Sequence, residues 1–106
     1  MTDADTQLLR DFKQLIDRFV SGAEVMLYGS RARGNPDPSS DYDFIVLTER
    51  SIPAETDARL QDAIYDFELD RQVVFSILVF SRDQWDTPGT VAAPFRRRVE
   101  REAVAL

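Results

Sequence analysis

The feature that most constrains this chain is a glycine–serine pair placed between two predicted strands and followed, after residues 31–40, by two aspartates. Gly29 and Ser30 come directly after residues 24–28, whose sequence Glu-Val-Met-Leu-Tyr predicts a short strand. Gly29 lets the chain turn sharply because it has no Cβ atom. Ser30 and the residues after it can open one turn of helix, whose free N–H groups and positive dipole end attract phosphate.

Asp41 and Asp43 stand at the start of the second predicted strand, over residues 42–48. Side chains at positions i and i+2 of a strand point to the same face, so the two carboxylates are expected to converge. Two such carboxylates repel each other and need a cation, and hard oxygen ligands beside a phosphate site suit Mg²⁺. Taken singly, Gly29 also fits a plain turn, Ser30 a helix N-cap and the aspartates a solvated strand start. Their combination favours a phosphate-and-metal site.

The longer string Gly29-Ser-Arg-Ala-Arg-Gly34, followed by Ser40-Asp-Tyr-Asp43, resembles the signature of the DNA polymerase beta-like nucleotidyltransferases, and within them the minimal nucleotidyltransferase branch. Members of that branch are small stand-alone domains, often encoded beside an HEPN-domain protein. The resemblance is densest over residues 25–47 and extends weakly to segments 81–85 and 94–102. It implies a mixed sheet of the polymerase beta palm kind.

The same resemblance implies which residues bind the substrate. The residues implied to contact the nucleotide are Gly29, Ser30, Arg31, Arg33 and Ser40. Asp41 and Asp43 are implied to hold Mg²⁺, with Mn²⁺ as the alternative, and ATP is the expected substrate. A forked guanidinium from Arg31 or Arg33 could grip the triphosphate, although Arg33 could equally pair with a carboxylate such as Asp37.

The family scheme also has a third carboxylate, on the strand after the second helix, which completes a second metal site and can act as the base. The predicted strand at residues 72–80 contains no aspartate or glutamate. Asp70 lies just before it and is the candidate for the third catalytic carboxylate, with Glu68 as a second candidate. Both also fit solvated loop residues, and a site without this ligand would turn over slowly or not at all.

Composition narrows the class of protein. The 106 residues suit one domain, 1–106, with a single core. The formal net charge of −6 argues against a general nucleic-acid-binding surface, and the run Arg96–Arg98 fits a solvated helix face. The chain has no cysteine and no histidine, which excludes disulfides, thiol catalysis and His-based sites. The N-terminus shows no signal segment, and the apolar stretch 73–80 is too short to span a bilayer, so a cytoplasmic protein is expected.

Periodicity predicts the remaining elements. Apolar residues recur at intervals of three and four over residues 4–20, as in an amphipathic helix. A second helix is expected to open near Pro53, and residues 72–80 are expected to form a central strand. Ser81–Gln84 has capping-box spacing for a short helix, and residues 93–103 form a last helix. We therefore predict an α/β (α+β) fold, with a small mixed sheet whose helices pack mainly on one face.

Two functions of different class follow. The first is Mg²⁺-dependent transfer of a nucleoside monophosphate, expected to be AMP from ATP, to a hydroxyl of a partner protein. In that case the resemblance implies an antitoxin acting on an HEPN toxin. The alternative is a catalytically weak or inactive nucleotide-binding module that neutralises or scaffolds a partner by binding alone. For such docking, aromatic residues around Trp85 and Phe95 could form a patch, although core packing is their commoner fate. Self-association through an edge strand stays open.

Overall fold

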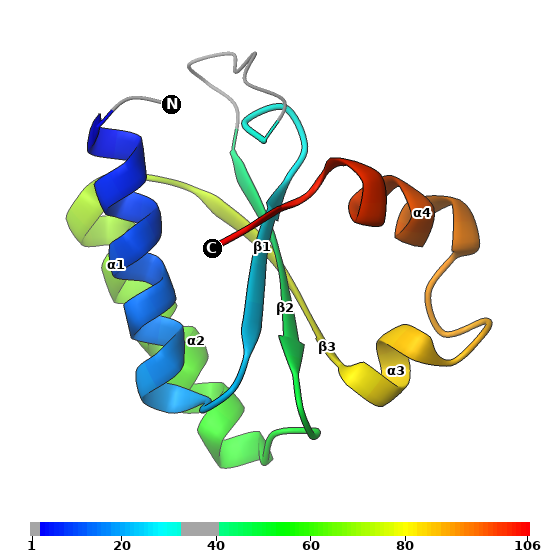
Figure 1. Cartoon of the computed structure of the whole chain (residues 1–106). Coiled ribbons are helices and arrows are strands. Elements are labelled where there is room, and N and C mark those ends of the chain that lie inside the picture. Colours follow the sequence, from blue (N-terminus) through cyan, green and yellow to red (C-terminus); the bar gives the residue numbers. More distant parts are fainter. Residues whose placement is uncertain (1–2, 33–40) are drawn as a thin grey trace.

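The computed structural model, which describes residues 3–32 and 41–106, shows helices and strands arranged around one four-stranded sheet (Figure 1). The elements in chain order are α1 (Asp3–Phe19), β1 (Glu24–Tyr28), β2 (Tyr42–Thr48), α2 (Ala54–Arg71), β3 (Phe75–Ser81), α3 (Arg82–Asp86), α4 (Ala93–Glu102) and β4 (Val104–Ala105). The predicted α/β fold with a mixed sheet is confirmed.

The strands lie in the order β3-β2-β1-β4. β1 and β2 run antiparallel, whereas β2 and β3 run parallel. In this register Asp43 lies opposite Tyr28 on one side and opposite Ser76 on the other. The two halves of the sequence motif, at the end of β1 and the start of β2, are therefore neighbours at one end of the sheet.

The prediction that residues 72–80 form a central strand is wrong, because β3 is an edge strand that pairs with β2 alone. Its uncharged, β-branched sequence resembles that of a strand covered on both faces. In the structure one face of this segment remains open: Val74 is 59% exposed and Leu78 is 40% exposed.

The main core lies between the sheet and the two long helices, α1 and α2, which lie together on one side of it (Figure 1). Phe12 of α1 is fully buried at its centre. Its ring centroid is 4.4 Å from that of Phe44 on β2 and 4.9 Å from that of Phe75 on β3. The helical periodicity of residues 4–20 thus corresponds to α1, and the predicted packing of helices mainly on one face is confirmed.

A smaller core lies on the opposite face, where the short helices α3 and α4 pack against the sheet. Its buried members are Ile45, Leu47, Trp85 and Val99. Trp85 is only 6% exposed, and the Phe95 ring meets Tyr28 edge-on with centroids 5.8 Å apart. These aromatic residues are therefore core residues, and the docking patch considered from the sequence is not formed by Trp85.

Side chains cap both ends of the edge strand β3. The backbone N–H of Phe75 donates to Glu68 Oε2 at 3.4 Å, and the N–H of Ser81 donates to Gln84 Oε1 at 2.9 Å. Ser81 Oγ in turn accepts from the Gln84 N–H, so the predicted capping box at α3 is present.

A strand that the sequence did not predict, β4, pairs through Val104 and Ala105 with β1.

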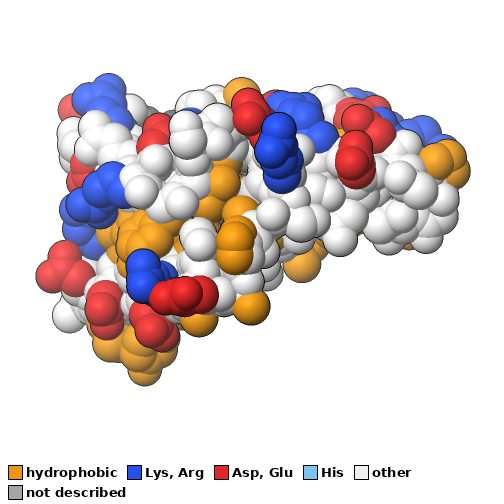
Figure 2. All heavy atoms as spheres, turned by 90° about the horizontal axis from the view of Figure 1, so that it is seen from below, with side chains coloured by type: hydrophobic (Ala, Val, Ile, Leu, Met, Phe, Trp, Pro, Cys, Tyr) orange, Lys and Arg blue, Asp and Glu red, His pale blue; other side chains and the backbone are white. Residues whose placement is uncertain are grey.

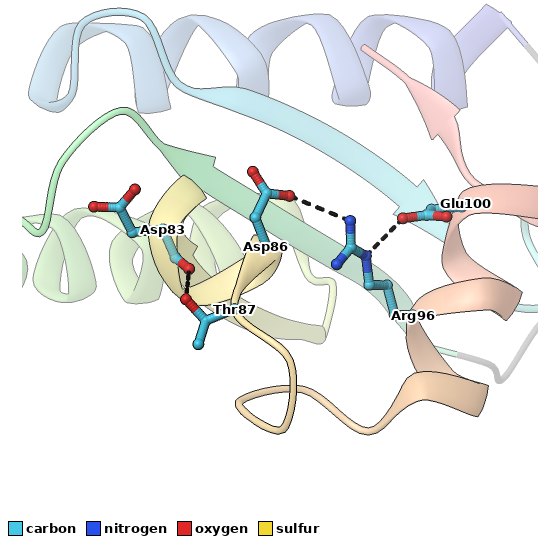
Figure 3. A network of polar contacts seen from close by, with 5 residues as sticks. All are labelled: Asp83, Asp86, Thr87, Arg96 and Glu100. Carbon is cyan, nitrogen blue, oxygen red and sulfur yellow. Dashed lines mark hydrogen bonds and ion pairs between the residues drawn. The ribbon is translucent and has the colours of Figure 1, made fainter.

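Several charged side chains on the helices pair within the chain. Arg96 of α4 donates to Asp86 Oδ1 at 3.2 Å and to Glu100 Oε1 at 2.7 Å (Figure 3). On the face shown in Figure 2, basic and acidic side chains are interspersed over the surface, with no basic stripe among the described residues. No helix within residues 3–32 and 41–106 has the length and apolarity needed to cross a membrane.

Candidate functional site

Gly29 and Asp43 touch at the end of the sheet where β1 stops and β2 starts. Gly29 has a φ of +79°, which side-chain-bearing residues rarely adopt. A Cβ atom built on Gly29 would lie 2.6 Å from Asp43 Oδ2, which is closer than real Cβ contacts allow. Two separate features therefore favour glycine at this position: the positive φ of the turn, and the Asp43 carboxylate that occupies the space of a Cβ atom. The backbone after β1 comes within contact distance of a candidate metal ligand.

Asp43 lies on the face of the sheet opposite to the face that carries the buried rings of Tyr42 and Phe44. Asp41 stands one residue before β2, and strand alternation continued by that one residue directs it to the same side as Asp43. Asp41 is exposed and Asp43 is half-buried. Burial raises the pKa of Asp43, and the neighbouring Asp41 carboxylate raises it further. The two predicted metal ligands therefore act on each other electrostatically.

Tyr28, at the end of β1, borders the same carboxylate. It lies opposite Asp43 in the antiparallel register. Burial raises the pKa of the Tyr28 hydroxyl, and the charge of Asp43 raises it further. Sequence reasoning did not assign Tyr28 to the site, although its place directly before Gly29 could have indicated it.

The phosphate-binding half of the motif is described only in part. Gly29 ends β1 and Ser30, Arg31 and Ala32 form a turn, so the predicted sharp turn after β1 is confirmed. Arg33 and Ser40, both predicted to contact the nucleotide, lie outside the described residues, as does Asp37. The prediction of a helical turn after Ser30 also falls partly on residues outside the described ones.

Arg31 lies on the side of the sheet that α1 and α2 cover. Its guanidinium carbon lies 4.0 Å from the centroid of the Tyr42 ring. Its Nη1 atom is 3.8 Å from Asp5 Oδ1 of α1, and the Tyr42 hydroxyl donates a 2.5 Å hydrogen bond to the same Asp5 oxygen. Burial and this hydrogen bond raise the pKa of Tyr42 to about 12. Nothing in the sequence singles out Asp5, since an acidic first turn is an ordinary complement to the helix dipole.

The structure does not bring Asp70 to the aspartate pair. Asp70 lies in the last turn of α2, where its side chain is 80% exposed and its Oδ2 is 3.4 Å from Arg71 Nε. The other candidate, Glu68, accepts the Phe75 N–H at the edge of β3. Among residues 3–32 and 41–106, no three acidic, histidine or cysteine side chains are grouped closely enough to hold a metal ion. The strand position beside Asp43 is occupied by Ser76.

The donor set at this end of the sheet fits a hard divalent cation that retains other ligands. Asp41 and Asp43 supply carboxylate oxygens on one face, and their mutual repulsion would be relieved by a bound cation. Mg²⁺ is commonly held by one or two protein carboxylates together with substrate phosphates. Two carboxylates therefore suit one Mg²⁺ bound with a nucleotide, and fall short of a complete site for two metal ions.

Comparison with known proteins bears on the fold and on the family of the chain. One solved chain, provisionally described as a minimal nucleotidyltransferase, is 28% identical, over 99% of this chain and 97% of that chain, with a TM-score of 0.61. A chain from a toxin–antitoxin structure with AMP-PNP shares the fold at 12% identity, covering 91% of this chain and 69% of that chain, with a TM-score of 0.64. None of the curated proteins matches. Residues 6–104 match the nucleotidyltransferase domain family, and the chain therefore belongs to that family.

Proposed function

We propose that this protein is a Mg²⁺-dependent nucleotidyltransferase that moves AMP from ATP to a hydroxyl of a partner protein. We further propose that the partner is an HEPN-domain toxin and that this chain is its antitoxin. The observation that supports the transfer reaction most is the contact between Gly29 and Asp43, with Asp41 on the same face, in a chain of the nucleotidyltransferase family.

Different residues of the chain would perform different parts of such a reaction. The backbone N–H groups of the turn after Gly29 would hold phosphate oxygens, and the absence of a side chain there leaves room for close approach. Asp41 and Asp43 would hold Mg²⁺, which when bound neutralises charge on the triphosphate and aligns the reacting groups. The acceptor hydroxyl would lose its proton to water as its oxygen bonds to the α-phosphorus, the bond between that phosphorus and the bridging oxygen would break, and pyrophosphate would leave.

The proposals of an adenine nucleotide and of a toxin partner rest on similarity to another protein of known structure. One fold neighbour comes from a toxin–antitoxin structure with AMP-PNP, an ATP analogue. That neighbour shares only 12% of residues, so it motivates the choice of ATP and of a toxin as first substrates to test. The choice of an HEPN-domain toxin rests on the sequence resemblance to the minimal branch.

A second candidate is a module that binds nucleotide without turning it over. Ser76 supports it, because this residue lies beside Asp43 on β3, the strand where the family scheme has its third carboxylate. Without that ligand, binding one Mg²⁺ with a nucleotide is still possible, but no third carboxylate among residues 3–32 and 41–106 joins the pair to act as the base. Neutralisation of a partner would then come from docking alone.

Transfer of radiolabel separates these candidates. The chain is incubated with Mg²⁺, its candidate partner and ATP labelled at either the α- or the γ-phosphate. AMP transfer labels the partner only from α-labelled ATP, and Asp41→Asn/Asp43→Asn abolishes it. The matched control Asp62→Asn/Asp66→Asn, which removes two exposed carboxylates from α2, retains it. Tight partner binding that survives the Asp41/Asp43 change, without label transfer, would support the binding module.

Nucleotide binding can be tested without a partner. A ligand that binds only the folded state raises the melting temperature, by an amount that grows with its concentration. We expect ATP with Mg²⁺ to stabilise the protein, and Asp41→Asn/Asp43→Asn to remove the Mg²⁺-dependent part. An unchanged melting temperature at millimolar ATP would contradict both candidates.

A further inference from the structure

Three side chains from separate parts of the chain form a cluster on the side of the sheet that α1 and α2 cover, opposite to the side of Asp43. They are Asp5 of α1, Arg31 of the turn after β1 and Tyr42 of β2. The Arg31 and Asp5 side chains are 15% and 23% exposed, and Tyr42 is 6% exposed. An arginine this well covered is unusual, because exposed guanidinium groups keep more of their hydration.

We propose that this Asp5–Arg31–Tyr42 cluster positions the aspartate pair against the turn after β1, and that Arg31 is a positioning residue rather than a phosphate ligand. The proposal rests on the proposed function, because the pair it positions is the metal- and nucleotide-binding pair.

The contacts of Tyr42 hold the first residue of β2 in place. Its ring lies nearly parallel to that of Phe44, at 7° with centroids 6.3 Å apart, and meets Phe75 edge-on at 5.7 Å. Its hydroxyl donates to Asp5, and the guanidinium carbon of Arg31 lies 4.0 Å from its ring centroid. Tyr42 is the residue between Asp41 and Asp43, and strand alternation directs its side chain to one face and the carboxylates to the other. Holding this ring in place therefore also holds the backbone from which the Asp41 and Asp43 side chains extend.

Arg31 links that ring to the other half of the motif. It stands two residues after Gly29, so its stacking on Tyr42 ties the turn after β1 to the start of β2. Asp5 accepts from the Tyr42 hydroxyl and offsets the charge of Arg31 at 3.8 Å. The guanidinium thus lies against α1, on the face opposite to the carboxylates. This arrangement sets the relative placement in which Gly29 and Asp43 touch.

The structure offers a matched control. Arg71 of α2 makes the same two kinds of contact, with its guanidinium carbon 4.8 Å from the Phe67 ring centroid and a 2.8 Å ion pair to Asp11. This second cluster joins α2 to α1, and none of its members belongs to the motif. Arg71→Gln therefore removes comparable packing and charge without touching the aspartate pair.

The test compares Arg31→Gln, Asp5→Ala, their double variant and Arg71→Gln in the transfer assay. Small displacements of reacting groups cost on the order of 100-fold in rate. We expect Arg31→Gln and Asp5→Ala each to lower kcat about tenfold, with KM for ATP within about twofold. The double variant should be little worse than either single one, because both remove the same cluster. Arg71→Gln should leave kcat unchanged.

Two outcomes would overturn the proposal. If Arg31→Gln raises KM for ATP about tenfold while Asp5→Ala has no effect, Arg31 is a phosphate ligand. If all variants lose only thermal stability, as Arg71→Gln does, the cluster is merely structural.

Hydrogen exchange keeps the proposal testable if the wild-type chain transfers no nucleotide, which would defeat the proposed function alone. Faster exchange at the amides of residues 42–44 in Arg31→Gln and Asp5→Ala, but not in Arg71→Gln, would support positioning. Exchange that is unchanged, or equally faster in Arg71→Gln, would overturn it.

Discussion

Gly29 and Asp43 are in close contact, because a Cβ atom at residue 29 would lie 2.6 Å from Oδ2 of Asp43. Gly29 lies directly after β1 and Asp43 lies on β2, so a side chain at residue 29 would collide with the carboxylate of the neighbouring strand. In the sequence, Gly29 marks a predicted turn and Asp43 marks the start of a predicted strand. In space they form one surface, on which a backbone without a side chain faces a carboxylate.

Gly29→Ala should therefore be more damaging than strain alone explains. Side-chain-bearing residues at positive φ cost about 1–2 kcal/mol, and the added methyl group must also displace the Asp43 carboxylate. Gly89→Ala is the matched control, because Gly89 has a φ of +87° and open space around it. Denaturant unfolding should show a larger loss for Gly29→Ala, and only that variant should lose Mg²⁺-dependent stabilisation by ATP. Equal losses, with nucleotide binding intact, would show that the contact is unimportant.

Ser76→Asp should add a third carboxylate beside Asp43, because the two residues lie opposite each other on parallel strands. Like charges facing each other across strands cost about 0.2–1 kcal/mol. Without divalent ions the variant should melt below Ser76→Asn, which adds similar bulk but no charge. With Mg²⁺ or Mn²⁺ it should show the larger rise in melting temperature, and faster transfer than wild type. A rise no larger than that of Ser76→Asn would place residue 76 outside the metal site.

Asp43→Asn should separate folding from function. Burial and the charge of Asp41 raise the pKa of Asp43 in the fold, so its ionised form is less favourable there than in the unfolded chain. At pH 7 without divalent ions, Asp43→Asn should unfold at a higher denaturant concentration than wild type. Addition of Mg²⁺ with ATP should then stabilise wild type but not the variant. A variant less stable than wild type under metal-free conditions would contradict this.

The stability of the link between α1 and α2 should depend on pH in acid. A hydrogen bond from Arg71 and a second one from Gln7 hold the pKa of Asp11 below its ordinary value of 3.8. A lowered folded-state pKa contributes stability above the unfolded value, and this is lost as pH falls through the folded value. The difference in unfolding midpoint between wild type and Asp11→Asn should be constant from pH 7 to about pH 5 and shrink below about pH 4. High salt should reduce it as well.

The sequence predicted those parts of the fold that local patterns determine. Gly29 marked the end of β1, and the apolar stripe over residues 4–20 located α1, which spans Asp3–Phe19. The edge position of β3 could not be predicted in this way, because strand order depends on how the chain connects and not on the strand's own composition. β4, at two residues, is too short to show alternation.

In the candidate site, too, local sequence patterns predicted some features and distant contacts determined others. Its carboxylate pair follows from the two-residue period of a strand, so Asp41 and Asp43 could be placed on one face from sequence alone. The direction of Arg31 could not, because it is set by Tyr42 and by Asp5, which lies 26 residues earlier in the chain. Nor could its neighbours in the sequence indicate it, since Gly29 and Ser30 suggest a phosphate contact. Roles that depend on partners distant in the sequence require the structure.

The two side chains that cap β3 bear on how the protein avoids aggregation. An uncharged seven-residue edge strand is a template on which another chain can add a strand. Glu68 and Gln84 occupy the backbone N–H groups of Phe75 and Ser81, at the two ends of that template. An incoming strand would meet a carboxylate at one end and an amide at the other. The helices before and after β3 thus shorten the length of edge open to another chain without adding a charge to the strand itself.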